Sequence, residues 1–253
     1  MSTLVRALSA EALKLKRTLA LWLAVIGPLS IVGLEFLVTW QRGAAHFRQT
    51  ENAWFKFGRG IFFASSMMVL PLFIALQAAL LAGLEHGNEQ WKHLYALPLP
   101  RWAVYAAKQL IGMALIGLSI GLLVFGTVLA GLALHLIDPA FGFAVTIPWG
   151  RLLRFAVGIY LASWLMISIH TWIGLRWKNF VLAMTVGVVA TLLAMVVGSD
   201  SAFARVYPWA MPGVLSYAFD TGRVAWLPVI WGALGGVAVA VWGSRAVTCR
   251  DVL

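Results

Sequence analysis

Long, unbroken runs of apolar residues constrain this chain more than any other feature. A helix needs about 20 consecutive apolar residues to cross the hydrocarbon core of a bilayer, and several runs reach that length. Hydrophobic residues make up 62% of the chain and charged residues only 11%, well below the roughly 25% of soluble domains. The runs do not alternate with polar residues, which predicts helices rather than the strands of a membrane barrel. The expected spans are Leu19 to Thr39, Gly60 to Leu84, Gln109 to Ile137, Leu152 to Leu175, Phe180 to Gly198 and Trp226 to Gly243.

These runs predict an all-α polytopic membrane protein with six transmembrane helices. We expect one transmembrane domain over residues 1–253, without a soluble domain. Six spans place both termini on one side of the membrane, and eleven of the 19 lysines and arginines fall on that side. Because basic residues favour the cytoplasm, we expect both termini to be cytoplasmic. The first span is longer than a signal-peptide core, so we expect no cleavage, although Gly43-Ala44-Ala45 resembles a cleavage site.

Three segments outside the spans have patterns of their own. In residues 4–16 leucines interleave with charged residues, which predicts an amphipathic helix on the membrane surface; a frayed basic tail is the alternative. The segment Gln41 to Arg59 carries Trp54, Phe55 and Phe57, and such aromatic residues suit the membrane interface. The segment Ser199 to Ala225 is amphipathic and too short to cross. It predicts a re-entrant or surface helical hairpin rather than a disordered loop.

The sequence encodes no nucleotide site. It contains no G-x-x-x-x-G-K-[ST] motif and no Gly-Lys pair, so no P-loop can form on this chain. We therefore expect no cofactor here, and any ATP hydrolysis belongs to another chain. The net charge of +10 lies in short loops beside apolar runs. This placement is typical of contact with anionic lipid headgroups and not of nucleic-acid binding.

The other common site chemistries are also missing. Glu85, His86 and Glu89 lie close enough to suggest a metal cluster, but a solvated helix end explains them better, and we expect no metal site. The G-x-S-x-G motif at residues 117–121 lies in the middle of a span and lacks the strand-to-helix turn of a hydrolase. The single cysteine, Cys249, cannot form a disulfide within the chain.

A few polar and aromatic residues within the spans are candidates for a substrate pathway or gate. Glu35 in the first span should face protein, a cavity or a cation, because a carboxylate in hydrocarbon is costly. Hydration near the interface, or pairing with an arginine, is the alternative. His170 suits hydrogen bonding between helices as well as function, and Trp164 lies deep enough to line a groove. The G-x-x-x-G motifs at 117–121 and 232–236 predict close helix packing without saying which helices meet.

The loop Glu85 to Lys108, EHGNEQWKHLYALPLPRWAVYAAK, is too polar for lipid and too patterned for a plain connector. It can form a short helix that lies flat on the membrane and receives force from a soluble partner. Together with EALKLKRTLALWLAVIGPL (Glu11 to Leu29) and the order of the spans, this loop resembles the ABC-2 type permease subunits. Within that group, the chain is most similar to the bacitracin-resistance and lantibiotic-immunity permeases.

The resemblance implies an ATP-driven exporter in a bacterial inner membrane, with substrates such as antibiotic peptides or lipid-linked molecules. Two permease chains, identical or paired, would form the pathway, and two separate ATPase subunits would bind ATP and Mg. A cytoplasmic coupling helix would contact the ATPase, and Pro208 to Phe219, with Pro208, Pro212 and Tyr217, would form an outer re-entrant hairpin. The alternatives are an ATPase-independent channel or secondary transporter, and a polytopic membrane enzyme. The implied coupling residues are Glu85, His86, Glu89, Trp91, Lys92 and Leu94.

Overall fold

The computed structural model describes residues 3–16, 18–46, 52–86, 100–143, 146–177, 179–199, 201–219 and 222–248. Every regular element in these ranges is helical, which confirms the predicted all-α class. Six helical stretches are long and apolar enough to cross a membrane, as expected for a multi-pass membrane protein. The helices are α1 (Thr3–Leu15), α2 (Leu19–Arg42), η1 (Ala44–His46), α3 (Ala53–Ala64), η2 (Ser65–Val69), α4 (Leu70–His86), α6 (Arg101–Ile137), η3 (Pro139–Phe141), α7 (Trp149–Arg176), α8 (Phe180–Val197), η4 (Phe203–Arg205), α9 (Met211–Tyr217) and α10 (Trp226–Thr248).

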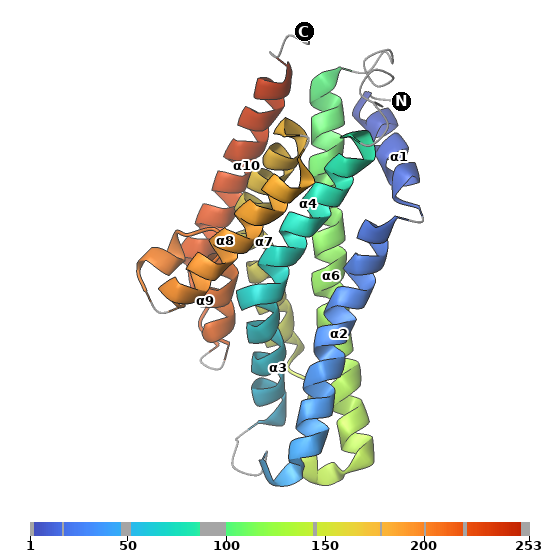
Figure 1. Cartoon of the computed structure of the whole chain (residues 1–253). Coiled ribbons are helices and arrows are strands. Elements are labelled where there is room, and N and C mark those ends of the chain that lie inside the picture. Colours follow the sequence, from blue (N-terminus) through green and yellow to red (C-terminus); the bar gives the residue numbers. More distant parts are fainter. Residues whose placement is uncertain are drawn as a thin grey trace.

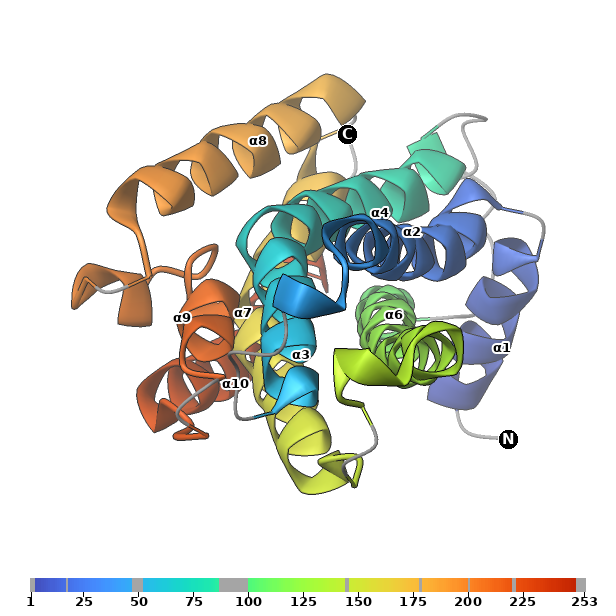
Figure 2. The same ribbon diagram turned by 90° about the horizontal axis from the view of Figure 1, so that it is seen from below.

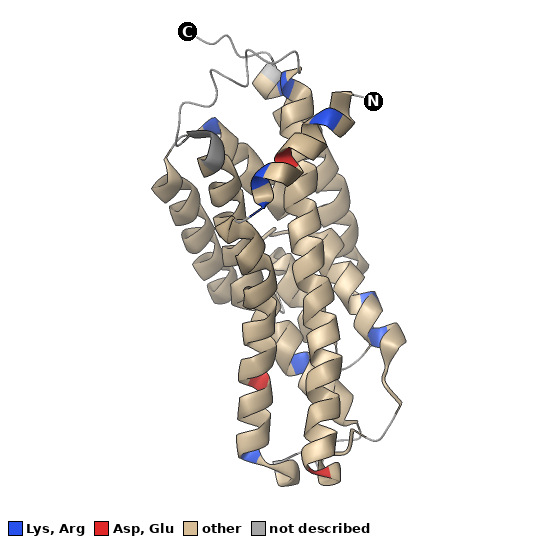
Figure 3. Ribbon diagram, turned by 90° about the vertical axis from the view of Figure 1, so that its right-hand side faces the viewer, with Lys and Arg blue, Asp and Glu red and all other residues tan. Residues whose placement is uncertain are grey.

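The helices form an elongated bundle with two distinct ends. Helix α1, the end of α4, the start of α6 and the end of α10 lie together at one end, which we call the terminal end (Figure 1). The opposite end, the far end, is formed by the end of α2, by α3 and by the end of α6. Seen along the bundle, α2, α4 and α6 lie beside α1, whereas α8 and α9 lie on the other side (Figure 2). Among the described residues, the charged positions along the ribbon lie toward the two ends, and a middle zone carries almost none (Figure 3).

The second span begins seven residues earlier than expected and covers Ala53–Gly83. The side-chain oxygen of Asn52 accepts a hydrogen bond from the backbone N–H of Trp54 at 2.9 Å and so caps the start of α3. The side chains of Trp54 and Phe57 are fully buried, and both meet the edge of the Phe143 ring. These two side chains therefore pack in the protein core, whereas Phe55 is half-buried; their level relative to the membrane interface stays a prediction.

A wide helical turn interrupts the second span between α3 and α4. Residues Ser65–Val69 form a π-helix, in which the N–H of Leu70 donates to the carbonyl of Ser65. Pro71 follows directly. Proline has no N–H, and in a regular α-helix its ring would collide with the carbonyl four residues earlier. The wider turn lets the span continue past the proline, and such π-bulges are frequent at functional sites.

The third span also begins earlier than expected, at Arg101 instead of Gln109. Pro100 precedes its first residue in an extended conformation, as suits the residue before a helix. With 37 residues, α6 is about 55 Å long at 1.5 Å per residue, well beyond the ~30 Å hydrocarbon core. Part of α6 therefore extends outside the hydrocarbon.

Helix α10 packs on α7 through the glycines of the second G-x-x-x-G motif. A β-carbon on Gly236 would lie 2.7 Å from the backbone of Trp164, and one on Gly232 would lie 2.5 Å from Ala162, so only glycine permits this approach. The hydroxyl of Ser168 on α7 also donates to the carbonyl of Gly236 at 2.8 Å. In the first motif, by contrast, a β-carbon on Gly121 would meet nothing within 4 Å.

Several helices expose large apolar side chains on the outside of the bundle. They include Trp22 on α2, Phe125 on α6, Val196 on α8 and Leu234 on α10. Such a surface suits contact with lipid chains, which confirms that these helices are built for a membrane.

Candidate coupling and gating sites

The loop that we predict to contact an ATPase starts and ends at the terminal end. Helix α4 runs to His86, so Glu85 and His86 lie in its last turn. Glu89, Trp91, Lys92 and Leu94 lie outside the described residues. All six stay a prediction as coupling residues. Residues 101–108, which we expected to form the end of the loop, belong to α6.

Helix α1 packs against the base of this loop. Ala7 of α1 is buried against Ala103 and Ala107, in the first two turns of α6. A second cluster joins the end of α1 to the start of α2, to α4 and to α6 and consists of Leu15, Ala20, Ala24, Leu81, Ile111 and Leu115. The predicted N-terminal helix therefore exists, and one of its faces is covered by protein. Its position at a membrane surface stays a prediction.

The segment 201–219 is exposed over most of residues 202–206 and largely buried from Trp209 to Phe219. It consists of η4, a turn and α9, and six of the seven residues of α9 are buried. Pro212 is buried in the first turn of α9, where the missing N–H of proline is harmless. Pro208 is half-buried just before α9, and Tyr217 is 47% exposed at its end.

One hydrogen bond joins this segment to the predicted gating residue His170. The indole N–H of Trp209 donates to His170 Nε2 at 3.2 Å, and the two rings meet edge to face. His170 is fully buried on α7. A ring nitrogen accepts a hydrogen bond only when it carries no proton, so this bond requires the neutral imidazole with its proton on Nδ1. That Nδ1 is buried and has no hydrogen-bond partner among the described residues.

Two further contacts anchor the segment near Trp209. The Tyr207 hydroxyl donates to the carbonyl of Ala190 on α8 at 2.9 Å. Partial burial raises the pKa of this hydroxyl above its ordinary value, so it stays a donor at neutral pH. Within α9, Gly213 packs against Met67 of the π-helix, where a β-carbon would lie 3.0 Å from the methionine sulfur. The segment thus joins α7, α8 and the π-helix.

The other end of the segment is held by Arg151 at the start of α7. Its guanidinium lies 3.6 Å from the centroid of the Phe55 ring and donates to the carbonyl of Phe219 at 3.5 Å. Gly222, with φ 67°, lies against the same guanidinium, and a β-carbon there would come within 2.9 Å of it. A cation over an aromatic face is attracted by the ring quadrupole, so Arg151 connects α3 and α7 to the end of the segment.

The predicted pathway residues lie in three different interfaces. Glu35 is half-buried between α2 and α3, and Gly60 leaves the space for its carboxylate, with Arg42 of the same helix close enough to act on its charge. Trp164 lies between α7 and α10 beside Tyr160, and its indole N–H is buried. Only His170 contacts the 201–219 segment. The structure therefore does not bring the three residues together into one site.

A comparison with family models identifies the protein family of this chain. The model described as "ABC-2 family transporter protein" matches residues 7–194, most of the chain. The chain belongs to the ABC-2 transporter family. Membership of this family fits the predicted transport subunit. No curated protein and no solved structure matches it.

Two features of this ABC-2 protein escaped sequence reasoning. Trp209 was one aromatic residue among many in its segment, and nothing in the local pattern pointed to a partner 39 positions away. Glu11 and Lys108 were not singled out, since they were only one charge of the predicted amphipathic helix and the last residue of the predicted loop, yet both are buried and paired. The only available signal was a carboxylate in a basic N-terminal helix and a lysine followed at once by an apolar run.

Proposed function

We propose that this chain is the transmembrane permease subunit of an ATP-driven ABC exporter in a bacterial inner membrane. Membership of the ABC-2 family is the observation that carries this proposal, because proteins of this family generally work with ABC ATPase partners. In this proposal both termini are cytoplasmic, so the terminal end of the bundle faces the ATPase. The chain acts as one transmembrane domain and pairs with a second permease chain, identical or paralogous.

The loop between α4 and α6 is the contact for the ATPase, which binds ATP and Mg on the partner subunit. Its base is packed by α1, α4 and α6, which supports a role in receiving force, because a push on a packed base moves several helices together. Trp91 and Leu94 are the apolar side chains that would enter a groove on the partner. Glu85, His86, Glu89 and Lys92 would flank this contact.

The 201–219 segment acts as the outer re-entrant hairpin and gate. Its Phe219 ring meets Phe155 of α7, whereas its Trp209 reaches His170, fifteen residues further along α7 toward the terminal end. At 1.5 Å per residue this is about 22 Å of helix, a large part of a ~30 Å hydrocarbon core. Such depth supports a hairpin that dips into the membrane from the outer face.

The substrate in this proposal is an amphipathic molecule, either an antibiotic peptide or a lipid-like compound, that leaves the membrane or the cell. The half-buried Glu35 supports a cationic group on it, because a carboxylate in a membrane interior attracts a cation strongly. The resemblance to the bacitracin-resistance and lantibiotic-immunity permeases favours a peptide.

Co-purification tests the central claim. The tagged chain, extracted in mild detergent from cells that carry its gene neighbourhood, should bring down a P-loop ATPase. Changing Trp91 and Leu94 to glutamate should abolish this association, whereas Gly150→Glu at the start of α7 should not. Gly150 is exposed at the opposite side of the bundle, and nothing lies within 4 Å of a β-carbon there.

A rival outcome would be turnover without any partner. If the purified chain alone moved substrate or ions across vesicles, an ATPase-independent channel or secondary transporter would replace the exporter. Chemical conversion of a membrane substrate would replace it with a polytopic enzyme. Retained ATPase binding in the Trp91→Glu, Leu94→Glu variant would show that the contact lies elsewhere.

A further inference from the structure

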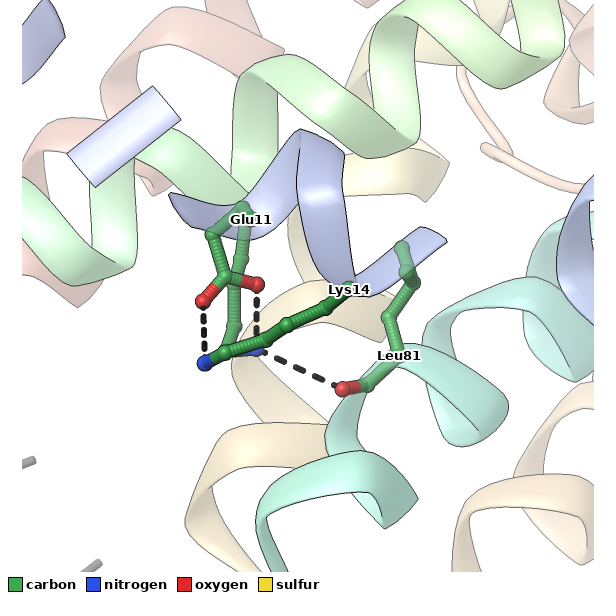
Figure 4. A network of polar contacts seen from close by, with 4 residues as sticks. Glu11, Lys14 and Leu81 are labelled. Carbon is green, nitrogen blue, oxygen red and sulfur yellow. Dashed lines mark hydrogen bonds and ion pairs between the residues drawn. The ribbon is translucent and has the colours of Figure 1, made fainter. Parts of the chain in front are cut away.

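A buried ion pair joins α1 to α6 at the base of the α4–α6 loop. Lys108 Nζ lies 2.7 Å from Glu11 Oε2, and the two side chains are only 2% and 4% exposed. Lys14, on the same helix as Glu11, binds the other carboxylate oxygen at 2.9 Å. Lys108 also donates to the carbonyl of Leu81 on α4 at 3.4 Å. Figure 4 shows one ammonium group at each carboxylate oxygen of Glu11, and one of these groups also reaches the carbonyl of Leu81.

Such a pair is a poor way to gain stability. Removing two charges from water carries a desolvation penalty that can exceed their mutual attraction, and well-packed apolar residues of similar volume are often as stable or more stable. A buried pair does, however, favour one arrangement, because a displacement would separate the buried carboxylate from the ammonium group at 2.7 Å. The presence of a buried pair at this position therefore points to the placement of α1 and not to stability.

The apolar contact beside the ion pair does little to fix the register between α1 and α6. The contact between the first half of α1 and the start of α6 is formed by the small side chains Ala7, Ala103 and Ala107, with Leu8 packed against them. Small residues allow close approach but provide few ridges and grooves that would fix how far one helix slides along the other. The Glu11–Lys108 pair supplies this register, and the bond from Lys108 to Leu81 includes α4 in it.

Helix α1 is also tightly connected to the first span. The hydroxyl and the backbone N–H of Thr18 both donate to the carbonyl of Leu15, at 2.8 and 3.0 Å. Ala24, on the second turn of α2, accepts a hydrogen bond from Ser119 of α6 at 2.9 Å. A displacement of α1 is therefore passed to the start of α2.

We propose that Glu11 and Lys108 are positioning residues that lock α1 to the base of the loop, so that movement imposed on the loop is carried to α1 and then to α2. This inference rests on the proposed function, since it takes an ATPase as the source of movement. Lys14 assists by holding the second carboxylate oxygen. The lock makes α1 a moving part of the transporter and not a passive anchor.

The first test asks whether the pair sets the register, and it needs no partner. In a Cys249→Ser background, Ala7→Cys is combined with Ala103→Cys or with Ala107→Cys, and disulfide formation is followed in the membrane-embedded chain. With the pair intact, one of the two combinations should dominate. In the apolar variant Glu11→Leu, Lys108→Met, both should form. Lys14→Met is the matched control, because it leaves the Glu11–Lys108 pair in place and should keep the native preference.

The second test asks whether the lock transmits movement. The complex with its ATPase is placed in nanodiscs, and Tyr217→Cys on the exposed end of α9 is labelled with a maleimide with and without ATP. The apolar variant should keep its ATPase and its ATP hydrolysis. Its difference in labelling with and without ATP should be at least about threefold smaller than that of the wild-type chain, within the range of measured coupling effects. A disulfide between residue 7 and the preferred residue of α6, formed before the Tyr217→Cys thiol is labelled, should restore most of that change.

The outcomes separate the two proposals. If wild-type chain recruits no ATPase, or shows no nucleotide-dependent labelling, the proposed function fails and the transmission claim falls with it, whatever the register test gives. If wild-type responds and the apolar variant responds equally, or if the disulfide restores nothing, the lock is overturned while the exporter stands. An unchanged disulfide preference in the apolar variant would overturn the register claim.

Discussion

Trp209 Nε1 donates to His170 Nε2 across 3.2 Å, and this bond joins a segment outside the spans to the interior of α7. The acceptor is fully buried, and the donor is only 8% exposed. Because neither buried group can bind water instead, breaking the bond is costly, and the bond favours the observed position of the 201–219 segment. We propose that this bond, which we call the latch, holds the 201–219 segment in the closed position of the proposed gate.

Breaking this latch should loosen the segment. Trp209→Phe keeps an aromatic ring but removes the donor, which leaves a buried acceptor unsatisfied at a cost of about 1–3 kcal/mol. We expect a lower thermal midpoint in detergent and faster maleimide labelling of Tyr217→Cys in a Cys249→Ser background. Trp226→Phe is the matched control, since Trp226 is 64% exposed. Equal labelling in both variants would show that the bond does not hold the segment.

The buried aromatic residues of α3 should behave as core residues. Trp54→Ala should destabilise the protein by about 3–5 kcal/mol, as expected for removing a large buried aromatic side chain. Trp54 is fully buried, whereas Trp40, near the end of α2, is 54% exposed. Trp40→Ala should therefore change the midpoint much less. Thermal unfolding in detergent compares the two variants, and a similar fall of the midpoint in both would contradict the placement of Trp54 in the core.

The two G-x-x-x-G motifs should respond oppositely to alanine. Gly236→Ala places a methyl group 2.7 Å from the backbone of Trp164, which forces α10 away from α7 and should cost about 1–3 kcal/mol. Gly121→Ala meets nothing within 4 Å and should be neutral or stabilising by up to about 1 kcal/mol. Thermal midpoints measure both, and a tolerated Gly236→Ala would contradict the close packing.

Apolar length and the lack of alternation were enough to predict six helical spans, because the bilayer imposes these requirements on each span separately. The starts of the second and third spans were missed for a common reason. Arg59 and Lys108 are charged, and each was taken as the end of a polar segment, whereas helices α3 and α6 already include them. A charge marks a helix boundary in lipid only when nothing in the protein compensates it, and Lys108 is paired with Glu11.

The contacts between distant residues could not be predicted in the same way. Glu11 and Lys108 are 97 positions apart, and Trp209 and His170 are 39 apart. Periodicity describes which face of a helix is apolar, but it does not say which other helix covers that face. His170 and the segment around Pro208 were both singled out from the sequence, for separate reasons, and their contact became visible only in the fold.

Glu35 should matter for substrate and not for folding. Glu35→Gln removes the charge but keeps the shape, and the carboxylate lies beside Gly60 between α2 and α3. If it meets a cationic group of the substrate, losing roughly 1 kcal/mol of attraction lowers the apparent affinity about fivefold. Cells that express this permease with its ATPase should then lose resistance to cationic amphipathic peptides, while the amount of protein in the membrane stays unchanged. Asp138→Asn is the matched control, because Asp138 is a half-buried acid at the far end whose side chain caps η3 by accepting a hydrogen bond from the N–H of Ala140. Equal resistance in the Glu35→Gln and Asp138→Asn strains would separate Glu35 from substrate recognition and leave hydration or Arg42 as the reason for its place in the span.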